Sequence, residues 1–267
     1  MGDRAQALRA LLEAVELLRR DLVGFAPGAP VYYVYNPLEY AAAPYHEYLR
    51  RFAVPPRAVR ERVLLLGMNP GPWGMAQTGV PFGAVSRVRD WLGLEGSVGR
   101  PEVEHPKRRV EGFACKREEV SGDRLWGWAQ RAFGTPQAFF RRFFVWNYCP
   151  LMFLDEAGRN LTPDRLRATE LARLIAPCDA ALRAVVAALG RPVVVGVGDF
   201  AAVRAREVLQ GSGLRVGKIL HPSPASPAAN RGWSMQAAAQ LRELGVEIPA
   251  DPGVETRSTQ SGRTSAR

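Results

Sequence analysis

Residues 63–83 read VLLLGMNPGPWGMAQTGVPFG, a short apolar run followed by a loop rich in glycine and proline. Val63–Leu66 has the uninterrupted apolar character of a strand that is buried on both faces of a sheet. In the loop Gly67–Gly83, glycines allow the backbone to approach a ligand closely and prolines keep the chain stiff. Such a loop at the carboxyl end of a buried strand predicts a binding site rather than core packing.

Two further loops are expected at the same edge of the sheet. The segment HPSPASPAANRGW (His221–Trp233) follows a strand predicted at Arg215–Leu220, and Phe143–Phe153 predicts another strand that runs into a loop at Asn147–Pro150. Because the carboxyl ends of parallel strands meet at one edge, we expect these loops to face each other across a single pocket.

Strands and helices alternate along the chain, with the remaining strand at Pro192–Gly198. This order predicts an α/β fold, a three-layer α/β/α sandwich around a central, mostly parallel four-stranded sheet. Thr162 is expected to cap one helix, and Pro177 is expected to break the chain between that helix and the next. Helices are predicted for residues 1–22, 44–52, 84–92, 123–133, 136–142, 163–175, 176–189, 201–209 and 230–244.

We expect residues 1–250 to form a single domain. Residues 95–119 are charged and aperiodic, which predicts a long surface loop. Residues 251–267 are polar and poor in hydrophobic side chains, which predicts a disordered tail.

The net charge of +10 and the pI of about 10.1 favour a polyanionic partner such as nucleic acid. No apolar 18-residue stretch or basic amphipathic helix suggests a membrane partner. The three cysteines are far apart in the sequence, which supports neither a disulfide framework nor a zinc or iron–sulfur site and fits a reducing cytoplasm. No metal is expected, because the sequence shows no cluster of metal-ligating residues. No nucleotide cofactor is expected, because the chain lacks GxGxxG and Gly-Lys-Ser/Thr motifs and the turn at Val195–Phe200 is of a kind common in α/β folds.

Two single side chains point to chemistry. His221 is one of three histidines and opens a stiff loop at a strand end, which favours a functional role. Asn69 has a comparable position, although an Asn before Pro can also set a turn through its own side chain.

Together, GMNPGPWGMAQTGVPFG and the HPSP…N.GW pattern of residues 221–233 resemble the single-strand-selective monofunctional uracil-DNA glycosylases, a branch of the uracil-DNA glycosylase superfamily. The resemblance covers roughly residues 63–244. Further matching blocks, in order, are EHPKR (Glu104–Arg108), EVSGDRLWG (Glu119–Gly127), NYCPLMFL (Asn147–Leu154), GRNLTP (Gly158–Pro163) and VVGVG (Val194–Gly198).

The resemblance implies a base-excision repair enzyme that flips uracil, or an oxidised thymine such as 5-hydroxymethyluracil, out of DNA. It would hydrolyse the N-glycosidic bond and leave an abasic site, with no lyase step and no cofactor. The implied partner is single- or double-stranded DNA, and we expect a monomer in the cytoplasm of a bacterium, at the nucleoid, or in the nucleus of a eukaryote.

By the same resemblance, Asn69 would position the attacking water, and His221 would donate a hydrogen bond to the uracil carbonyl oxygen that gains negative charge. An amide is a poor base, so most of the acceleration would come from stabilising charge.

The resemblance also assigns the base pocket. Phe82 would stack on the flipped ring, and Asn147 would bind its Watson–Crick edge and reject cytosine. The backbone at Met68 and the side chain of Met75 would shape the pocket, while Gly71 would leave space that a bulkier residue would close.

The loop after His221 is expected to act as a wedge in the DNA. Vertebrate members carry an arginine where this chain has Ala225, which puts penetration of the duplex in question but not the chemistry. The residues expected to contact DNA are Pro222, Ser223, Pro224, Ala225 and Arg231.

Two other functions remain open at this point. The chain could be a glycosylase for deaminated purines such as xanthine or hypoxanthine. It could also be a non-catalytic module that binds single-stranded or damaged DNA, although binding alone requires no water-positioning amide.

Overall fold

The computed structural model describes residues 2–55 and 61–249. The central sheet has four parallel strands, as predicted, and their order is β3-β2-β6-β7; every residue of β2, β3 and β6 is buried. The tail predicted for residues 251–267 lies outside the described residues. The four strands are β2 (Val63–Gly67), β3 (Phe143–Asn147), β6 (Val193–Val197) and β7 (Val216–Ile219).

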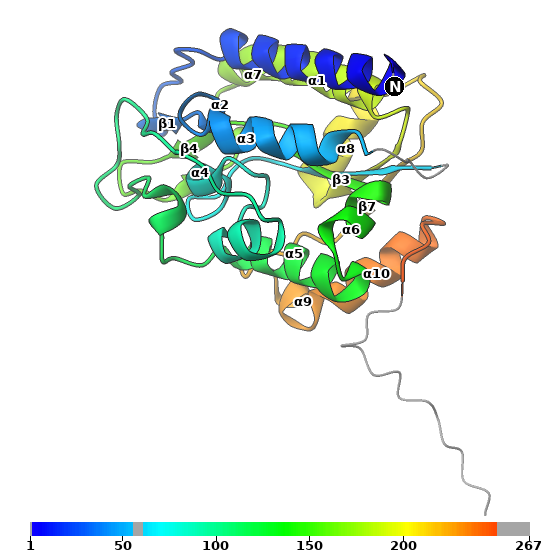
Figure 1. Ribbon diagram of the computed structural model, residues 1–267. Coiled ribbons are helices and arrows are strands. Elements are labelled where there is room, and N and C mark those ends of the chain that lie inside the picture. Colours follow the sequence, from blue (N-terminus) through cyan, green and yellow to red (C-terminus); the bar gives the residue numbers. More distant parts are fainter. Residues whose placement is uncertain (1, 56–60, 250–267) are drawn as a thin grey trace, which may run out of the picture.

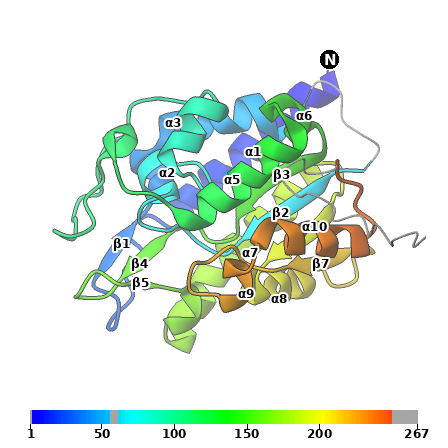
Figure 2. The ribbon, with the colours of Figure 1, turned by 90° about the horizontal axis from the view of Figure 1, so that it is seen from below.

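Helices cover both faces of this sheet, so the predicted three-layer architecture is confirmed. The long helices α1 (Gly2–Asp21) and α7 (Ala168–Ala188) pack along each other on one side. On the opposite side lie α5 (Val120–Phe133) and α10 (Trp233–Glu243), which are nearer the viewer when the molecule is seen from below (Figure 1 and Figure 2). Helix α8 (Asp199–Val208) connects β6 to β7 and packs against both strands.

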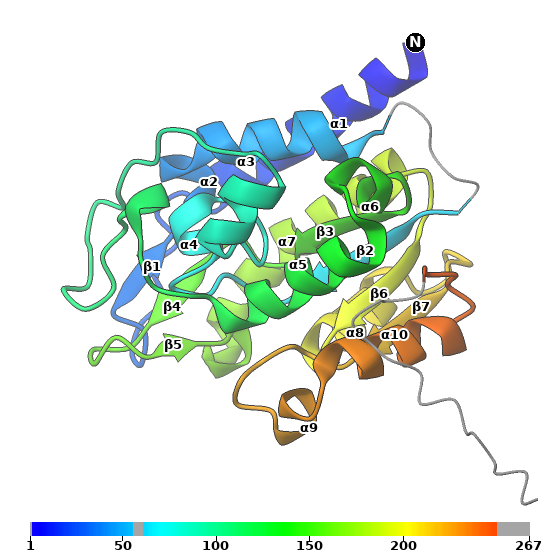
Figure 3. The same ribbon diagram turned by 60° about the horizontal axis from the view of Figure 1, so that its bottom comes forward.

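The aromatic-rich segment VYYVYNPLEY (residues 31–40) contributes a strand to a second, smaller sheet that the sequence analysis did not predict. Strand β1 (Tyr33–Tyr35) pairs antiparallel with β4 (Met152–Leu154), which pairs in turn with β5 (Asn160–Leu161), and the three strands lie to one side of the main sheet (Figure 3). The chain therefore leaves β3 at Asn147 and enters a different sheet within a few residues.

The prediction for residues 162–189 was wrong in two ways. Residues Pro163–Arg165 form only a 3₁₀ turn, without a side-chain cap from Thr162, and α7 begins at Ala168. Helix α7 then continues through Pro177 to Ala188. A proline removes one backbone hydrogen bond, but burial of the apolar face of α7 outweighs this loss, since tertiary packing supplies most helix stability.

Two other expectations need correction. Residues 95–119 are largely irregular, as expected, but they are not confined to the surface, because His105, Val110 and Cys115 are buried. The last helix, predicted for residues 230–244, begins only at Trp233 (α10), because Gly232, with φ of 96°, adopts a left-handed conformation just before it, and the short helix α9 (Pro227–Asn230) that precedes it was not predicted.

Some of the remaining elements were predicted from the sequence and others were not. Helix α6, for example, starts at Pro136, where the Thr135 side chain accepts a hydrogen bond from the N–H of Ala138 at 3.3 Å. The elements that lie in predicted helices are α6 (Pro136–Arg142), α3 (Ala42–Tyr48) and two π-helical turns at Leu49–Ala53 and Arg87–Trp91. The elements that were not predicted are α2 (Pro37–Tyr40), α4 (Met75–Thr78) and a 3₁₀ turn at Gly112–Ala114.

Candidate active site

A cavity of about 420 Å³ lies beyond the carboxyl ends of the four parallel strands. It is bordered by residues that follow β2, β3, β6 and β7, so the predicted meeting of the strand-end loops is found in the structure. Its lining includes nine of the residues singled out from the sequence: Met68, Asn69, Gly71, Met75, Phe82, Asn147, His221, Ser223 and Pro224.

The ends of β2 and β3 hold the floor of the cavity. Gly67 and Asn147 are register partners, and the ladder continues beyond them as the N–H of Cys149 donates to the carbonyl of Met68 at 2.8 Å. A Cβ atom on Gly67 would lie 2.6 Å from Cε2 of Phe82 and would also collide with Oδ1 of Asn147. Glycine is therefore required at position 67 for the ring and the amide to meet at the cavity floor.

The side chain of Asn147 is buried, and its Nδ2 donates a weak hydrogen bond to Sδ of Met75 at 3.3 Å. Within the described residues no group donates to its Oδ1, so a ligand can use both ends of the amide. A buried amide with a free acceptor and a replaceable donor contact is suited to reading the polar edge of a planar base.

Asn69 is fixed by one hydrogen bond, from its Nδ2 to the carbonyl of Leu151 at 3.3 Å. In the described part of the chain its Oδ1 has no donor. That oxygen can therefore accept a hydrogen bond from a water molecule in the cavity and orient it, as expected for a positioned nucleophile.

Phe82 and His221 lie side by side in the cavity. Their ring centres are 6.0 Å apart and the ring planes are tilted by 40°. Phe82 has a positive φ of 54°, which is uncommon for a residue with a side chain, and a Cβ on Gly122 of α5 would collide with its carbonyl oxygen. Such strain at a ligand-facing residue is typical of functional sites.

Burial lowers the pKa of His221 to about 4, so its imidazole is neutral at neutral pH. No described group hydrogen-bonds to this ring. A neutral imidazole keeps one N–H, and that N–H can donate to an oxygen of the ligand.

The loop after His221 is fastened to α5. The Arg124 guanidinium donates to the carbonyl of Pro222 at 3.1 Å and to that of Ser223 at 3.3 Å, and it reaches Oδ1 of Asn230 at 2.7 Å. Pro222 is buried beneath the loop, whereas Ala225 and Arg231 are exposed and do not line the cavity. Of the residues expected to contact DNA, Pro222, Ala225 and Arg231 thus do not line the cavity, and Ala225 and Arg231 face solvent.

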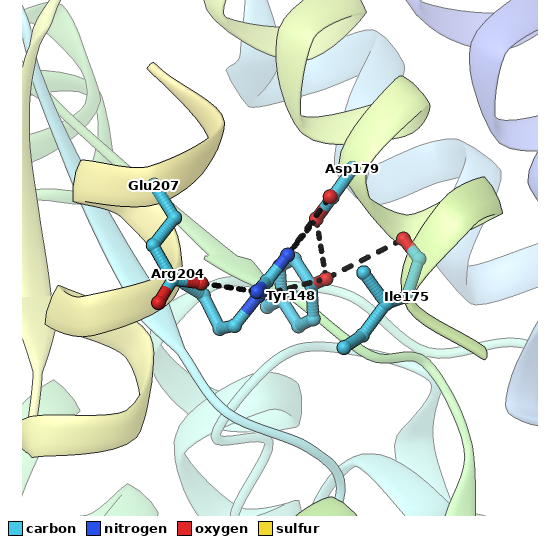
Figure 4. Close-up of polar contacts among 5 residues, drawn as sticks. All are labelled: Tyr148, Ile175, Asp179, Arg204 and Glu207. Atoms are coloured by element: carbon cyan, nitrogen blue, oxygen red, sulfur yellow. Dashed lines mark hydrogen bonds and ion pairs between the residues drawn. The ribbon is translucent and has the colours of Figure 1, made fainter. Parts of the chain in front are cut away.

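A polar network lies behind Asn147 and joins the loop after β3 to α7 and α8 (Figure 4). The hydroxyl of Tyr148 donates to Oδ1 of Asp179 at 2.5 Å, and Arg204 donates to both carboxylate oxygens of Asp179 at 2.8 Å. Arg204 also pairs with Glu207. Burial and the bond to Asp179 raise the pKa of Tyr148, so its hydroxyl remains a donor. Because Tyr148 follows Asn147 directly, this network supports the position of the buried amide.

Several lining residues were missed by sequence reasoning. Glu119 packs against the first loop, where a Cβ on Gly71 would lie 2.5 Å from its Oε2. The space at Gly71 is therefore taken by this carboxylate, and burial raises the pKa of Glu119. The others are Pro72, Gly74, Ser121, Asn160, Thr162, Val197, Gly198, Asp199 and Phe200.

The signal for some of these was present in the sequence. Asp199 and Phe200 follow the strand that ends in VGVG, a junction that the sequence analysis interpreted as a turn common in α/β folds.

Within the described residues, no three His, Cys, Asp or Glu side chains are grouped so as to hold a metal ion. No described helix is both long enough and apolar enough to cross a bilayer.

Known proteins resemble the chain in sequence and fold. The Uracil DNA glycosylase superfamily profile matches residues 56–242. The single-strand selective monofunctional uracil-DNA glycosylase of Rattus norvegicus is 52% identical over 219 residues, which cover 81% of this chain and 77% of the rat protein. The protein of the same name from Bos taurus is 52% identical over 247 residues, which cover 92% of this chain and 86% of the bovine protein. The crystal structure of SMUG2 from Pedobacter heparinus matches 85% of this chain and 98% of its own with a TM-score of 0.57 at 18% identity, a likeness of fold.

Proposed function

Because the chain belongs to the uracil DNA glycosylase superfamily, we propose that its cavity receives a uracil flipped out of DNA and that Asn69 and His221 hydrolyse the N-glycosidic bond. The chain is a monofunctional uracil-DNA glycosylase, and its product is an abasic site that enters base-excision repair. The single observation that carries the residue assignment is that Asn69, Phe82, Asn147 and His221, from three separate strand ends, line one cavity.

Recognition of the base follows from the geometry of the floor. The Nδ2 of Asn147 donates to the O4 carbonyl of uracil, and its Oδ1 accepts from N3–H. Cytosine presents an acceptor at N3 and an amino group at C4, so both contacts would be mismatched. Phe82 stacks on the flipped ring and contributes the binding energy that offsets part of the cost of extrusion.

Cleavage separates charge. The bond between C1′ and N1 breaks with its electron pair on uracil, a water oxygen bonds to C1′, and the proton that this water releases passes to solvent, from which the departed uracil anion takes up a proton. Asn69 orients that water through its free Oδ1. The neutral His221 ring donates to the uracil carbonyl oxygen on which negative charge accumulates, which stabilises the leaving anion.

We further propose that the chain acts as a monomer where the cell's DNA lies, in the nucleus of a eukaryote or at the nucleoid of a bacterium. Residues 1–250 would form its single domain. The loop Pro222–Arg231 would contact DNA next to the cavity, with Ser223 and Pro224 at the rim and the exposed Arg231 near a phosphate.

A panel of oligonucleotides tests this assignment. Each carries U, 5-hydroxymethyluracil, xanthine or hypoxanthine in single- or double-stranded DNA, and products are separated after alkaline cleavage of abasic sites. We expect release of uracil and of 5-hydroxymethyluracil and little release of the purines. Preferred release of xanthine or hypoxanthine would favour a glycosylase for deaminated purines, and binding without release of any base would favour a damage-binding module.

A further inference from the structure

The first loop carries a second feature that the chemistry does not use. Trp73 lies between Pro72 and Gly74, both of which line the cavity. Two guanidinium groups lie over its indole ring, that of Arg108 at 5.1 Å from the ring centre and that of Arg117 at 5.3 Å. Both arginines come from the irregular segment 104–119, which ends at the cavity residue Glu119.

These two cations are held by an aromatic face instead of by carboxylates. Within residues 2–55 and 61–249, neither Arg108 nor Arg117 forms an ion pair with a carboxylate. The four acids of the same segment do not pair with them. Glu104 accepts the N–H of Val110 at 2.7 Å, and Glu119 faces the glycines of the first loop. Glu111 and Glu118 form no ion pair within the described residues. Two like charges on one ring repel each other, so the arrangement favours a bound anion between or beside them.

The surrounding residues extend this positive surface. Lys107, Arg109 and Lys116 are exposed beside the two arginines, and none of the three pairs with a carboxylate in the part of the chain that the structure describes. Helix α4, which follows Trp73, and helix α9, in the loop after His221, lie apart in both Figure 1 and Figure 3. The basic groups of segment 104–119 therefore lie against the first loop, Gly67–Gly83, and apart from the stiff, proline-rich loop after His221.

We propose that Trp73, Arg108 and Arg117 form a phosphate clamp that holds the DNA strand beside the flipped nucleotide. This inference rests on the proposed function for its ligand, DNA, and it adds a contact surface separate from the loop Pro222–Arg231. Guanidinium groups bind phosphate oxygens through paired N–H donors. Stacking on Trp73 limits the conformations of both side chains before DNA arrives, so less entropy is lost on binding.

The clamp is tested with an uncleavable ligand, a single-stranded oligonucleotide without uracil, whose dissociation constant is measured by fluorescence anisotropy between about 50 and 200 mM salt. The variant Arg108→Gln/Arg117→Gln keeps long polar side chains over the ring. The matched control is Arg51→Gln/Arg173→Gln, which also removes two exposed arginines that lie over rings, those of Phe52 at 5.1 Å and Phe25 at 5.8 Å, and that do not line the cavity.

We expect the clamp variant to raise the dissociation constant by about tenfold or more at low salt. The slope of the logarithm of the binding constant against the logarithm of the salt concentration should become shallower by about 1.4. Each phosphate contact on single-stranded DNA contributes about 0.7 to this slope, and the variant loses two. The control should change the slope by less than half as much. Uracil release at saturating substrate should stay within about twofold of the parent, because the clamp touches no reacting atom.

A second variant tests the role of the ring. Trp73→Leu keeps both arginines but removes the aromatic face, so it should weaken binding, and Trp73→Phe should restore most of it. Equal slopes and affinities in the clamp and control variants would overturn the clamp. If the parent protein itself released no uracil, the proposed function would fail, whatever the binding data showed.

Discussion

In the proposed mechanism His221 meets the substrate as a neutral ring, since burial lowers its pKa to about 4. A neutral donor can stabilise the uracil anion without forming an ion pair beforehand, and it remains in this state across the physiological range. The protonation state of the ring is thus a consequence of the cavity walls and not of a partner side chain.

We predict that His221→Leu lowers turnover about 10²- to 10³-fold, the usual effect of losing one donor to a developing oxyanion. The measurement is single-turnover uracil release near pH 7.5. A loss below tenfold would mean that other groups stabilise the leaving anion.

The same pKa shift makes the fold sensitive to acid. Between pH about 6.5 and about 4 the unfolded chain binds a proton at His221 and the folded chain does not, so stability is lost as the pH falls through this window. Urea unfolding at pH 7 and pH 4.5 should therefore show a smaller acid-induced loss for His221→Leu than for the parent. An identical loss in both proteins would show that the ring is not held neutral.

Asn147 is the residue that should set base selectivity. We predict that Asn147→Asp weakens uracil excision and allows detectable excision of cytosine, because a protonated or rotated carboxyl can pair with cytosine where the amide cannot. The assay compares U- and C-containing single strands at high enzyme concentration. Background cytosine release from a well-folded variant would remove Asn147 from the role of base reader.

At the scale of elements, the parts that are local in sequence were predictable. The apolar residues of β2 and the loops rich in glycine and proline after β2 and β7 correctly predicted where the cavity lies, because strand ends and stiff loops have strong local sequence signatures. The three-residue strand β1 is too short to show a period, and α7 passes through Pro177 because its packing along α1 is a tertiary effect.

Glu119 shows why the candidate site was only partly predictable. Its carboxylate reaches the first loop from a position nearly fifty residues later in the chain, and only the packing of α5 against Gly71 and Gly74 brings them together. No spacing within the sequence encodes such a contact.

The network that joins α7, α8 and the loop after β3 should contribute to stability. We predict that Asp179→Asn lowers the free energy of unfolding by about 1–3 kcal/mol. This loss is smaller than the loss expected from breaking a fully buried ion pair, because Glu207 still neutralises the charge of Arg204. The control is Asp90→Asn in the exposed pair with Arg89, where we expect no measurable loss of stability because solvent screens the pair. Urea denaturation measures the free energy of unfolding of both variants. An equally small loss for Asp179→Asn and Asp90→Asn would show that the network does not contribute to stability.

At the scale of the whole molecule, we expect net charge and the side chains of the loop after His221 to determine which DNA substrates are preferred. The chain carries a net charge of +10 and has the short, exposed side chain of Ala225 in the loop after His221, which we expect to act as a wedge. A short side chain cannot replace an extruded base in the duplex, so weakly paired bases should be preferred, since they cost less to flip.

We predict faster excision of uracil from single strands and from G·U pairs than from A·U pairs. Ala225→Arg should raise activity on A·U duplexes more than on single strands. The measurement is the initial rate of uracil release from single strands, G·U duplexes and A·U duplexes. Equal rates for the parent protein would show that the loop opens the duplex without a long side chain at position 225.

The central claim is that Asn69 positions the water that cleaves the N-glycosidic bond in this cavity. The most direct test is single-turnover reaction of a uracil-containing single strand with the parent protein and with Asn69→Ala, following free uracil and the intact abasic strand by mass spectrometry, with DNA binding measured in parallel. We predict free uracil and an uncut abasic strand from the parent, and a rate lower by several orders of magnitude with preserved DNA binding for Asn69→Ala. Near-normal turnover by Asn69→Ala would contradict the account.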